Sequence, residues 1–280
     1  MYISDSEILA YIAEDLPYFD LTTSLQDIKK QAVLKIFTRE EVVVSCIDVA
    51  ARAAELLGCE AKILIQNTQT AKTNDMIVQI LGSYSNVHKA WKLVQIMLEY
   101  TCKIATYTNQ MTRLAKAENE KCEILATRKS FPFAKKLCLK AVIEGGGGVH
   151  RLGLSDSILF FKNHIIAYAS FDEFLAQIPS FKAKMPERKI AVEVESLEQA
   201  KELLGAGVDV VQCDKFSPQM LENTVALRDE IYPNARIIAS GGINAKNVAE
   251  FARTNIDAIT TSAPYAQGMA DLTSKLEILD

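Results

Sequence analysis

Apolar residues follow a mixed pattern in the first hundred residues. Behind Ser4 or Asp5, either of which can cap a helix, apolar positions at near-helical spacing predict a helix to about Glu14. Gly58 marks the end of a second predicted helix. That second helix spans 48–57. The other expected elements are two strands in 32–45 with a turn at 38–41, strands at 62–65 and 76–81, and a long amphipathic helix from about 86 to 103. The mixture predicts an α+β module.

Beyond Cys122 the pattern becomes a regular alternation of short apolar strands and helical stretches. The six expected strands span 124–127, 157–161, 190–194, 208–213, 237–240 and 258–261. Helical spacing recurs at 197–204, 218–231 and 245–254, each long enough for a crossover. Such alternation predicts a parallel sheet, and six strands of near-continuous apolar character predict its closure. The expected fold class is α/β, with a C-terminal parallel α/β barrel of about six strands and a boundary near 103–110.

Composition and charge narrow the class of protein. The chain has 280 residues, of which 49% are hydrophobic and 24% charged, and this excludes disorder as its main state. The net charge of −4 is unlike the basic stripe that nucleic-acid binding requires, so no nucleic-acid partner is expected. The acidic N-terminal stretch lacks the pattern of a secretory leader, and no run approaches about 18 apolar residues. No membrane insertion is expected.

The six cysteines are scattered, without a C-x-x-C pair or a nearby histidine at ligand spacing. This pattern is typical of small buried hydrophobic residues in a reducing compartment. We therefore expect a cytoplasmic protein.

Candidate chemistry is concentrated at the carboxyl ends of the expected barrel strands, where parallel α/β barrels gather their reactive side chains. The residues at or beside these ends are Arg128, Lys129, His150, Arg151, Glu193, Glu195, Asp214, Ser240, Gly241, Gly242, Ser262 and Ala263. Basic groups, acidic groups and a glycine turn on one face suit a polyanion that carries a metal ion.

The basic groups and the glycine turn each have a plainer interpretation as well. Gly241 and Gly242 precede a helix expected near Ala245, where bare amides can approach an anion, but most such turns only satisfy backbone geometry. The cations between Lys121 and Lys140 are as compatible with a solvated basic face as with an anion site. These two features therefore favour a phosphate site only in combination with others.

The acidic positions also allow two interpretations. Glu193 and Glu195 share parity along their strand, so both point to one side, and inside a barrel they would need cations or protons. Asp214 offers the hard oxygens that Mg²⁺ prefers, or it caps the helix expected at Pro218. His164, just past a strand, shapes a turn or takes part in catalysis, and the residues leave this open.

Residues 127–165, TRKSFPFAKKLCLKAVIEGGGGVHRLGLSDSILFFKNHI, resemble the quinolinate phosphoribosyltransferase family, also called nicotinate-nucleotide pyrophosphorylases. The family's TRK, GGG-x-x-HR-x-GL-x-D, VEVE, Asp-ended strand and SGGI turn have counterparts in the same order, and Asp20–Thr23 and Ile104–Thr106 match as well. The resemblance implies an N-terminal α/β sandwich domain over 1–105 and an α/β barrel phosphoribosyltransferase domain over 106–280, whose C-terminal tail packs back on the first. It also implies a homodimer with shared active sites, and leaves further assembly open.

The resemblance further implies an activity and a set of roles. The family transfers a phosphoribosyl group from Mg²⁺-bound phosphoribosyl pyrophosphate to a pyridine-dicarboxylate nitrogen, with decarboxylation and pyrophosphate release. Lys129, Glu193 and Asp214 would be catalytic, and the two acids would bind ribose hydroxyls or, indirectly, Mg²⁺. The expected substrate-binding residues for carboxylate and phosphate oxygens are Arg128, His150 and Arg151, with Lys129. Lys92 and Lys162 are expected to bind substrate as the nearest counterparts of two cations of the family, and Ser240, Gly241, Gly242, Ser262 and Ala263 at the 5-phosphate end.

Two departures from the quinolinate pattern stand out. The K-D-N-H run of those enzymes is here Phe161-Lys162-Asn163-His164, so Phe161 takes the place of the active-site lysine and Lys162 follows one residue later. A shift by one residue along a strand points a side chain to the opposite face unless a bulge intervenes. The arginine that the family lends across the dimer has its nearest counterpart in Lys92, which keeps the charge but loses the forked donor.

The Trp91-Lys92 pair, HRLGLSD and the absent lysine resemble the ModD branch of this family, which is named for an association with molybdenum transport. We therefore expect a ModD-type pyrophosphorylase, a pentosyltransferase with Mg²⁺ and phosphoribosyl pyrophosphate, whose acceptor is aromatic and anionic. Two alternatives stay open: a genuine quinolinate phosphoribosyltransferase, and a non-catalytic anion-binding barrel linked to molybdate handling.

Overall fold

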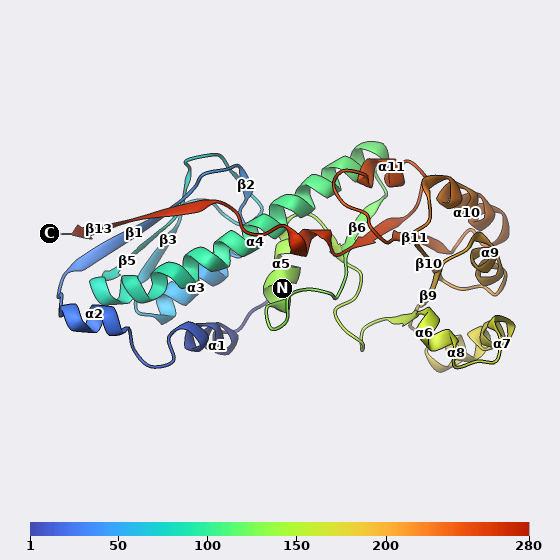
Figure 1. The fold of residues 1–280 in the computed structure, drawn as a ribbon, viewed down its shortest axis with the longest axis horizontal. Helices are drawn as coiled ribbons and strands as arrows, with labels where there is room; N and C mark the ends of the chain where they lie inside the picture. The colour runs from blue at the N-terminus through green and yellow to red at the C-terminus, as the bar shows by residue number, and fades with distance from the viewer. Residues whose placement is uncertain (280) are drawn as a thin grey trace. The chain divides into compact units, whose positions relative to one another are not determined.

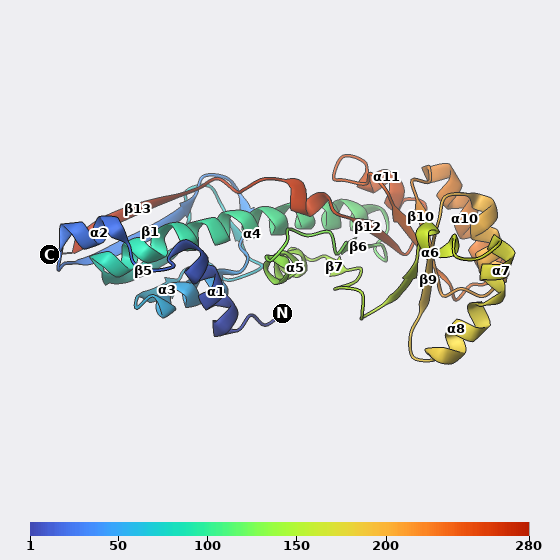
Figure 2. The same cartoon turned by 60° about the horizontal axis from the view of Figure 1, so that its bottom comes forward.

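The chain folds into two compact units in the computed structural model, which describes residues 1–279 (Figures 1 and 2). The first unit consists of Met1–Asn109, Ser130–Gly146 and the chain from Pro264, and the second of Gln110–Lys129 and Gly147–Ala263. The chain therefore passes from one unit to the other more than once. The domain division near residue 105 stays a prediction.

The first unit contains a four-stranded antiparallel sheet in the order β13-β1-β5-β3, and β2 and β4 form a separate two-stranded sheet. Its elements are α1 (Asp5–Asp15), α2 (Leu21–Gln26), β1 (Gln31–Thr38), β2 (Val42–Val43), α3 (Ile47–Leu56), β3 (Glu60–Ile63), β4 (Thr70–Ala71), β5 (Met76–Ser83), α4 (Tyr84–Glu118, to Asn109), α5 (Lys135–Glu144), part of the 3-10 helix η1 (Ala263–Ala266) and β13 (Leu272–Leu279). Buried residues of β1 and β5 pack with those of α3 and α4 in one apolar core.

Two expectations for this unit need correction. The strands expected in 32–45 both form, but they do not pair: β1 pairs with β5 and with the C-terminal β13, whereas β2 pairs with β4. The long helix runs to Glu118 rather than Lys103. It continues because Ile104, Met111 and Ala115 extend the buried apolar stripe, and no glycine or proline interrupts it.

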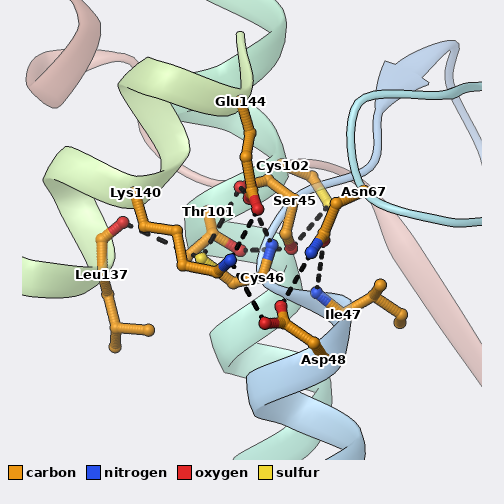
Figure 3. A network of polar contacts seen from close by, with 10 residues as sticks. All are labelled: Ser45, Cys46, Ile47, Asp48, Asn67, Thr101, Cys102, Leu137, Lys140 and Glu144. Atoms are coloured by element: carbon orange, nitrogen blue, oxygen red, sulfur yellow. Dashed lines mark hydrogen bonds and ion pairs between the residues drawn. The ribbon is translucent and has the colours of Figure 1, made fainter. Parts of the chain in front are cut away.

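A buried polar network joins α5 to the start of α3 (Figure 3). Glu144 on α5 accepts hydrogen bonds from the Ser45 hydroxyl at 2.7 Å and from the Cys46 amide at 2.9 Å. The Lys140 ammonium lies 2.7 Å from Glu144 and 3.2 Å from Asp48. The Glu144 carboxylate thus accepts a hydrogen bond from the Cys46 amide at the start of α3, where amides have no acceptor within the helix.

Removal of the Ser45 hydroxyl tests this network. We expect Ser45→Ala to lower the free energy of unfolding by about 1.5–3 kcal/mol, because a buried hydrogen bond to a charged group is lost. Urea denaturation followed by circular dichroism measures the change. Ser24→Ala is the matched control, since the Ser24 hydroxyl makes an exposed bond to Leu21. Equal stability of the two variants would contradict the assigned role.

The second unit is built on a seven-stranded parallel sheet in the order β7-β6-β12-β11-β10-β9-β8. Its elements are the end of α4, β6 (Glu123–Ala126), β7 (Gly148–Val149), β8 (Ile158–Phe160), α6 (Lys162–Ile165), α7 (Phe171–Ala176), α8 (Ile178–Lys184), β9 (Ile190–Val194), α9 (Leu197–Gly205), β10 (Val210–Asp214), α10 (Pro218–Ile231), β11 (Arg236–Ser240), α11 (Val248–Ala252) and β12 (Ala258–Thr261). All six expected strands are present, which confirms the α/β class.

The barrel in this unit is a half-barrel. The two-residue strand β7, which the sequence pattern did not predict, forms one edge and β8 the other, and within residues 1–279 no strand closes the gap between them. Because the seven strands are parallel, their carboxyl ends share one edge of the sheet. That common edge brings the polar ends of β6, β9, β10, β11 and β12 together.

Two further findings concern the cysteines and the helices of the described residues. All six cysteines are buried and free of disulfides. Among residues 1–279, no helix combines the length and the apolar composition that crossing a bilayer would need.

Candidate active site

A cavity of about 780 Å³ opens at the carboxyl ends of the half-barrel strands. The expected site residues that line it are Arg128, Lys129, His150, Arg151, Lys162, Glu193, Asp214, Ser240, Gly241, Gly242 and Ser262. Glu195 and His164 line it too, although β9 ends at Val194, so strand parity does not determine the direction of Glu195. Ala263 and Lys92 are not among the lining residues.

The floor of the cavity is a hydrogen-bonded row across β9, β10 and β11. The Gln212 amide nitrogen donates to Glu193 Oε2 at 2.5 Å and lies 3.4 Å from Ser240 Oγ. Ser240 Oγ in turn donates to Asp214 Oδ1 at 3.2 Å. The row connects the two carboxylates through one amide and one hydroxyl, all within the second unit.

Gln212 was not among the expected site residues. It is only 3% exposed and stands two positions before Asp214, so both side chains point to the same face of β10. A glutamine inside the apolar run VVQCD, at the same parity as a candidate acid, is the sequence feature that could have identified it, because such a side chain is seldom buried without a partner.

Glu193 occupies a half-buried position in which its charge is disfavoured. Burial and then the nearby charge of Asp214 raise the pKa of this carboxyl, while the Gln212 hydrogen bond and Lys129 act in the opposite direction. A folded-state pKa above the unfolded value means that protonated Glu193 stabilises the fold at low pH. This stabilisation is lost as the pH rises through the folded pKa.

Neutralising Glu193 should therefore stabilise the fold at neutral pH. We expect Glu193→Gln to raise Tm at pH 7 by roughly 2 °C, and the difference to disappear below about pH 4, where the native carboxyl is protonated too. Calorimetry at both pH values measures this. Glu195→Gln, on an exposed side chain, is the matched control and should leave Tm unchanged. A gain of the same size at both pH values would contradict the electrostatic explanation.

Basic side chains form one wall of the cavity. Burial and the charge of Arg151 lower the pKa of His150. Burial and the charge of Arg128 lower the pKa of Arg151, whose side chain is almost completely inside the protein. Arg128 and Arg151 repel each other in this way and are poised to bind an anion, since a bound negative charge would relieve both the repulsion and part of the burial cost.

Phe161 lies beside this basic wall. The Arg151 guanidinium carbon is 5.3 Å from the centroid of the Phe161 ring, a cation–π contact. The His164 imidazole stacks on the same ring at 5.7 Å, and its Nδ1 accepts the Phe161 amide hydrogen at 3.0 Å. With Nδ1 engaged as an acceptor, the proton of neutral His164 is on Nε2, which makes that nitrogen a donor.

Lys162 was expected on a strand, but it lies outside one. The strand β8 ends at Phe160, and Lys162 is the first residue of α6. Strand alternation therefore does not separate it from Phe161, and both residues line the cavity. Its ammonium lies 3.4 Å from Glu195, and both side chains are largely exposed. An exposed pair of this kind is weak and leaves Lys162 free to reorient.

The glycine turn after β11 forms a further part of the cavity wall. Gly241 has a φ of +91°, and a Cβ there would come within 2.8 Å of Asp214 Oδ1, so only glycine fits. The helix expected near Ala245 begins at Val248 instead and has five residues. The reason is that Asn244 and Asn247 side chains accept backbone amides in between, which favours turns over helix. The Gly-Gly amides thus stand apart from a helix terminus.

Ser262 and Ala263 follow β12. The Ser262 hydroxyl is 2.8 Å from the Thr127 hydroxyl and lines the cavity, whereas the Ala263 amide donates to Thr261 Oγ1 at 3.0 Å. Lys92 belongs to the first unit, where its ammonium lies 4.6 Å from the centroid of the Trp91 ring. The roles expected for Ala263 and Lys92 stay predictions.

The acids of the floor suit a magnesium ion that arrives with its substrate. Glu193 and Asp214 offer carboxylate oxygens, and a cation would relieve the repulsion that raises the pKa of Glu193. Within the described chain no three His, Cys, Asp or Glu residues gather as a metal-binding group. Mg²⁺ commonly takes one or two carboxylates together with substrate phosphates, and the residues fit that arrangement.

Two family models match consecutive parts of the chain. The model of the C-terminal domain of quinolinate phosphoribosyl transferase covers residues 104–273, and the model of its N-terminal domain covers residues 20–102. The chain belongs to the quinolinate phosphoribosyltransferase family. This confirms the family that the sequence motifs indicated, and it makes the chain a member of a family of phosphoribosyltransferases that use phosphoribosyl pyrophosphate.

Relatives within the quinolinate phosphoribosyltransferase family include proteins of the ModD branch. The candidate pyrophosphorylase ModD of Pasteurella multocida is 32% identical over 97% of this chain and 97% of its own length. ModD of Rhodobacter capsulatus is 35% identical over 90% of this chain and 96% of its own. Among solved structures, NadC from Streptococcus pyogenes matches with a TM-score of 0.90 at 26% identity, over 100% of both chains.

Proposed function

We propose that this protein is a ModD-type pyrophosphorylase that transfers a phosphoribosyl group from phosphoribosyl pyrophosphate, with Mg²⁺, to an aromatic anionic acceptor other than quinolinate. The observation that carries the proposal is the Phe161 ring against the Arg151 guanidinium. In the family pattern, quinolinate enzymes have an active-site lysine at the position that Phe161 occupies in this chain. Without a cation at that position, the site offers one charged partner fewer to the two carboxylates of quinolinate, which disfavours this acceptor.

The other residues that line the cavity would form two binding regions, one for the acceptor and one for the 5-phosphate of the donor. Arg128, Lys129, His150 and Arg151 would hold the anionic group of the acceptor and nearby phosphate oxygens. The turn residues Ser240, Gly241 and Gly242, with Ser262, would hold the 5-phosphate through amides and hydroxyls. A homodimer in which Lys92 completes the partner's site is part of this proposal and rests on the family pattern.

The proposed chemistry depends mainly on position and charge. Departure of pyrophosphate leaves an oxocarbenium-like ribosyl carbon, and Glu193 and Asp214 would stabilise its positive charge. Mg²⁺, when bound, would neutralise charge on the leaving pyrophosphate. The basic wall would hold the acceptor nitrogen in line with the ribosyl carbon, and no covalent intermediate with the chain is needed.

The deciding experiment measures binding and then turnover. Isothermal titration calorimetry with phosphoribosyl pyrophosphate and Mg²⁺ should show saturable, magnesium-dependent binding. Pyrophosphate release is then screened across aromatic acids, with quinolinate included. Release with another aromatic acid, and little with quinolinate, supports the proposal. Efficient release with quinolinate would instead make the protein a genuine quinolinate phosphoribosyltransferase. Binding of the donor without release for any acceptor would favour an anion-binding barrel.

A further inference from the structure

The Gln212 side chain ends in a buried oxygen that no other group satisfies. Gln212 lies on β10, is 3% exposed and lines the cavity. Its Oε1 has no hydrogen-bond partner among the described residues. A buried acceptor left without a donor is destabilising, so this oxygen favours any ligand that brings a donor to it.

The neighbours of Gln212 fix which way its amide points. Its Nε2 donates to Glu193 Oε2, and it also lies within reach of Ser240 Oγ, which donates onward to Asp214. The reversed amide would bring Oε1 against the Glu193 carboxylate, and two acceptors would then face each other. The network therefore directs Nε2 toward Glu193 and leaves Oε1 as the unoccupied acceptor.

Gln212 and the two acids together form an acceptor-rich floor, defined here as Glu193, Gln212 and Asp214. Where no cation lies between them, such a floor repels phosphate and carboxylate groups, because both carboxylates and the amide oxygen carry negative or partial negative charge. It suits a neutral group with several adjacent O–H donors. Of the parts of phosphoribosyl pyrophosphate, only the ribose with its neighbouring hydroxyls has this chemistry.

We propose that Gln212 binds the donor substrate, and that its Oε1 accepts a hydrogen bond from a ribose hydroxyl of phosphoribosyl pyrophosphate. The inference rests on the proposed function and adds to it a binding residue on the floor between the two acids. Gln212 takes no part in bond breaking, so its contribution is to affinity for the ribose and to its orientation.

The test compares a probe that has the ribose with one that lacks it. Calorimetric titration of the full-length protein uses phosphoribosyl pyrophosphate with Mg²⁺ and, separately, inorganic pyrophosphate with Mg²⁺. We expect Gln212→Met, which keeps the side-chain volume but no hydrogen-bonding group, to weaken binding of phosphoribosyl pyrophosphate about 5- to 30-fold. Binding of inorganic pyrophosphate should stay unchanged. If the Met variant does not fold, Gln212→Asn replaces it in the test. This variant keeps an amide but withdraws its oxygen by one methylene, and it should also weaken binding of phosphoribosyl pyrophosphate.

The possible outcomes distinguish a failure of the role proposed for Gln212 from a failure of the proposed function. Unchanged affinity for phosphoribosyl pyrophosphate in a folded variant overturns the role of Gln212 and leaves the proposed function intact. Equal weakening of both probes also overturns it, because the effect would then not depend on the ribose. Absence of binding of phosphoribosyl pyrophosphate to the unmodified protein overturns the proposed function and this inference with it.

Discussion

Asp214→Asn should lower the rate of pyrophosphate release by about 10²- to 10³-fold, the size of effect seen when one electrostatic contact to a transition state is removed. The carboxylate would face the developing positive charge of the ribosyl carbon, whereas an amide of the same shape offers no charge. Ser240 Oγ, which donates to Asp214 Oδ1, can still donate to the amide oxygen. The packing around the site therefore changes little.

Steady-state pyrophosphate release with the acceptor found by screening measures this effect, and thermal unfolding checks the fold. Tm should shift by no more than a few degrees, since within residues 1–279 the ion pair of Asp214 is with exposed Lys215 at 3.7 Å. Asp229→Asn is a control on an exposed acid of the same unit outside the cavity. Full activity in Asp214→Asn would remove this residue from the catalytic group.

Phe161→Lys should raise kcat/KM for quinolinate by about 10- to 100-fold. A lysine here would add a charged donor to the basic wall, and a hydrogen bond to a charged group contributes about 1.5–3 kcal/mol. The new ammonium would lie close to Arg151, which the present ring contacts at 5.3 Å. Repulsion between the two cations places the gain below that of an isolated ion pair.

Phe161→Leu separates the effect of charge from the effect of the missing ring. It removes the contacts with Arg151 and His164 without adding a donor, and it should give no gain with quinolinate. Initial rates with quinolinate over a range of concentrations give kcat/KM for all three proteins. A gain of equal size in the Leu and Lys variants would show that space, and not charge, excludes quinolinate.

Most of the half-barrel could be predicted because six of its seven strands are short apolar runs between polar turns, whereas the two-residue strand β7 has no such pattern. The same regularity placed the candidate site, since parallel strands bring their carboxyl ends to one edge. β13 is different. Its residues Leu272–Leu279 mix apolar with polar and charged side chains without strict alternation, and among them only Leu272 is buried. Its partner β1 is far away in the sequence. No local pattern reports such a pairing.

Within the site, the sequence pattern identified charged groups better than their surroundings. Arg151 and Glu193 were recognisable by type and position, but their perturbed pKa values depend on burial and on neighbours from other strands. The orphaned oxygen of Gln212 is likewise a property of three strands together. The position of Lys162 depended on where β8 stops, and strand ends are the least regular part of the pattern.

The pairing of β13 with β1 has a consequence for synthesis on the ribosome. Gln31 lies opposite Leu279, so β1 obtains one of its two neighbours from a segment that is translated after the second unit. Until then β1 presents an open edge of unpaired amides and carbonyls, a template for pairing with other chains. The first unit therefore completes its sheet only after the second unit has been translated, although most residues of the first unit precede it in the chain.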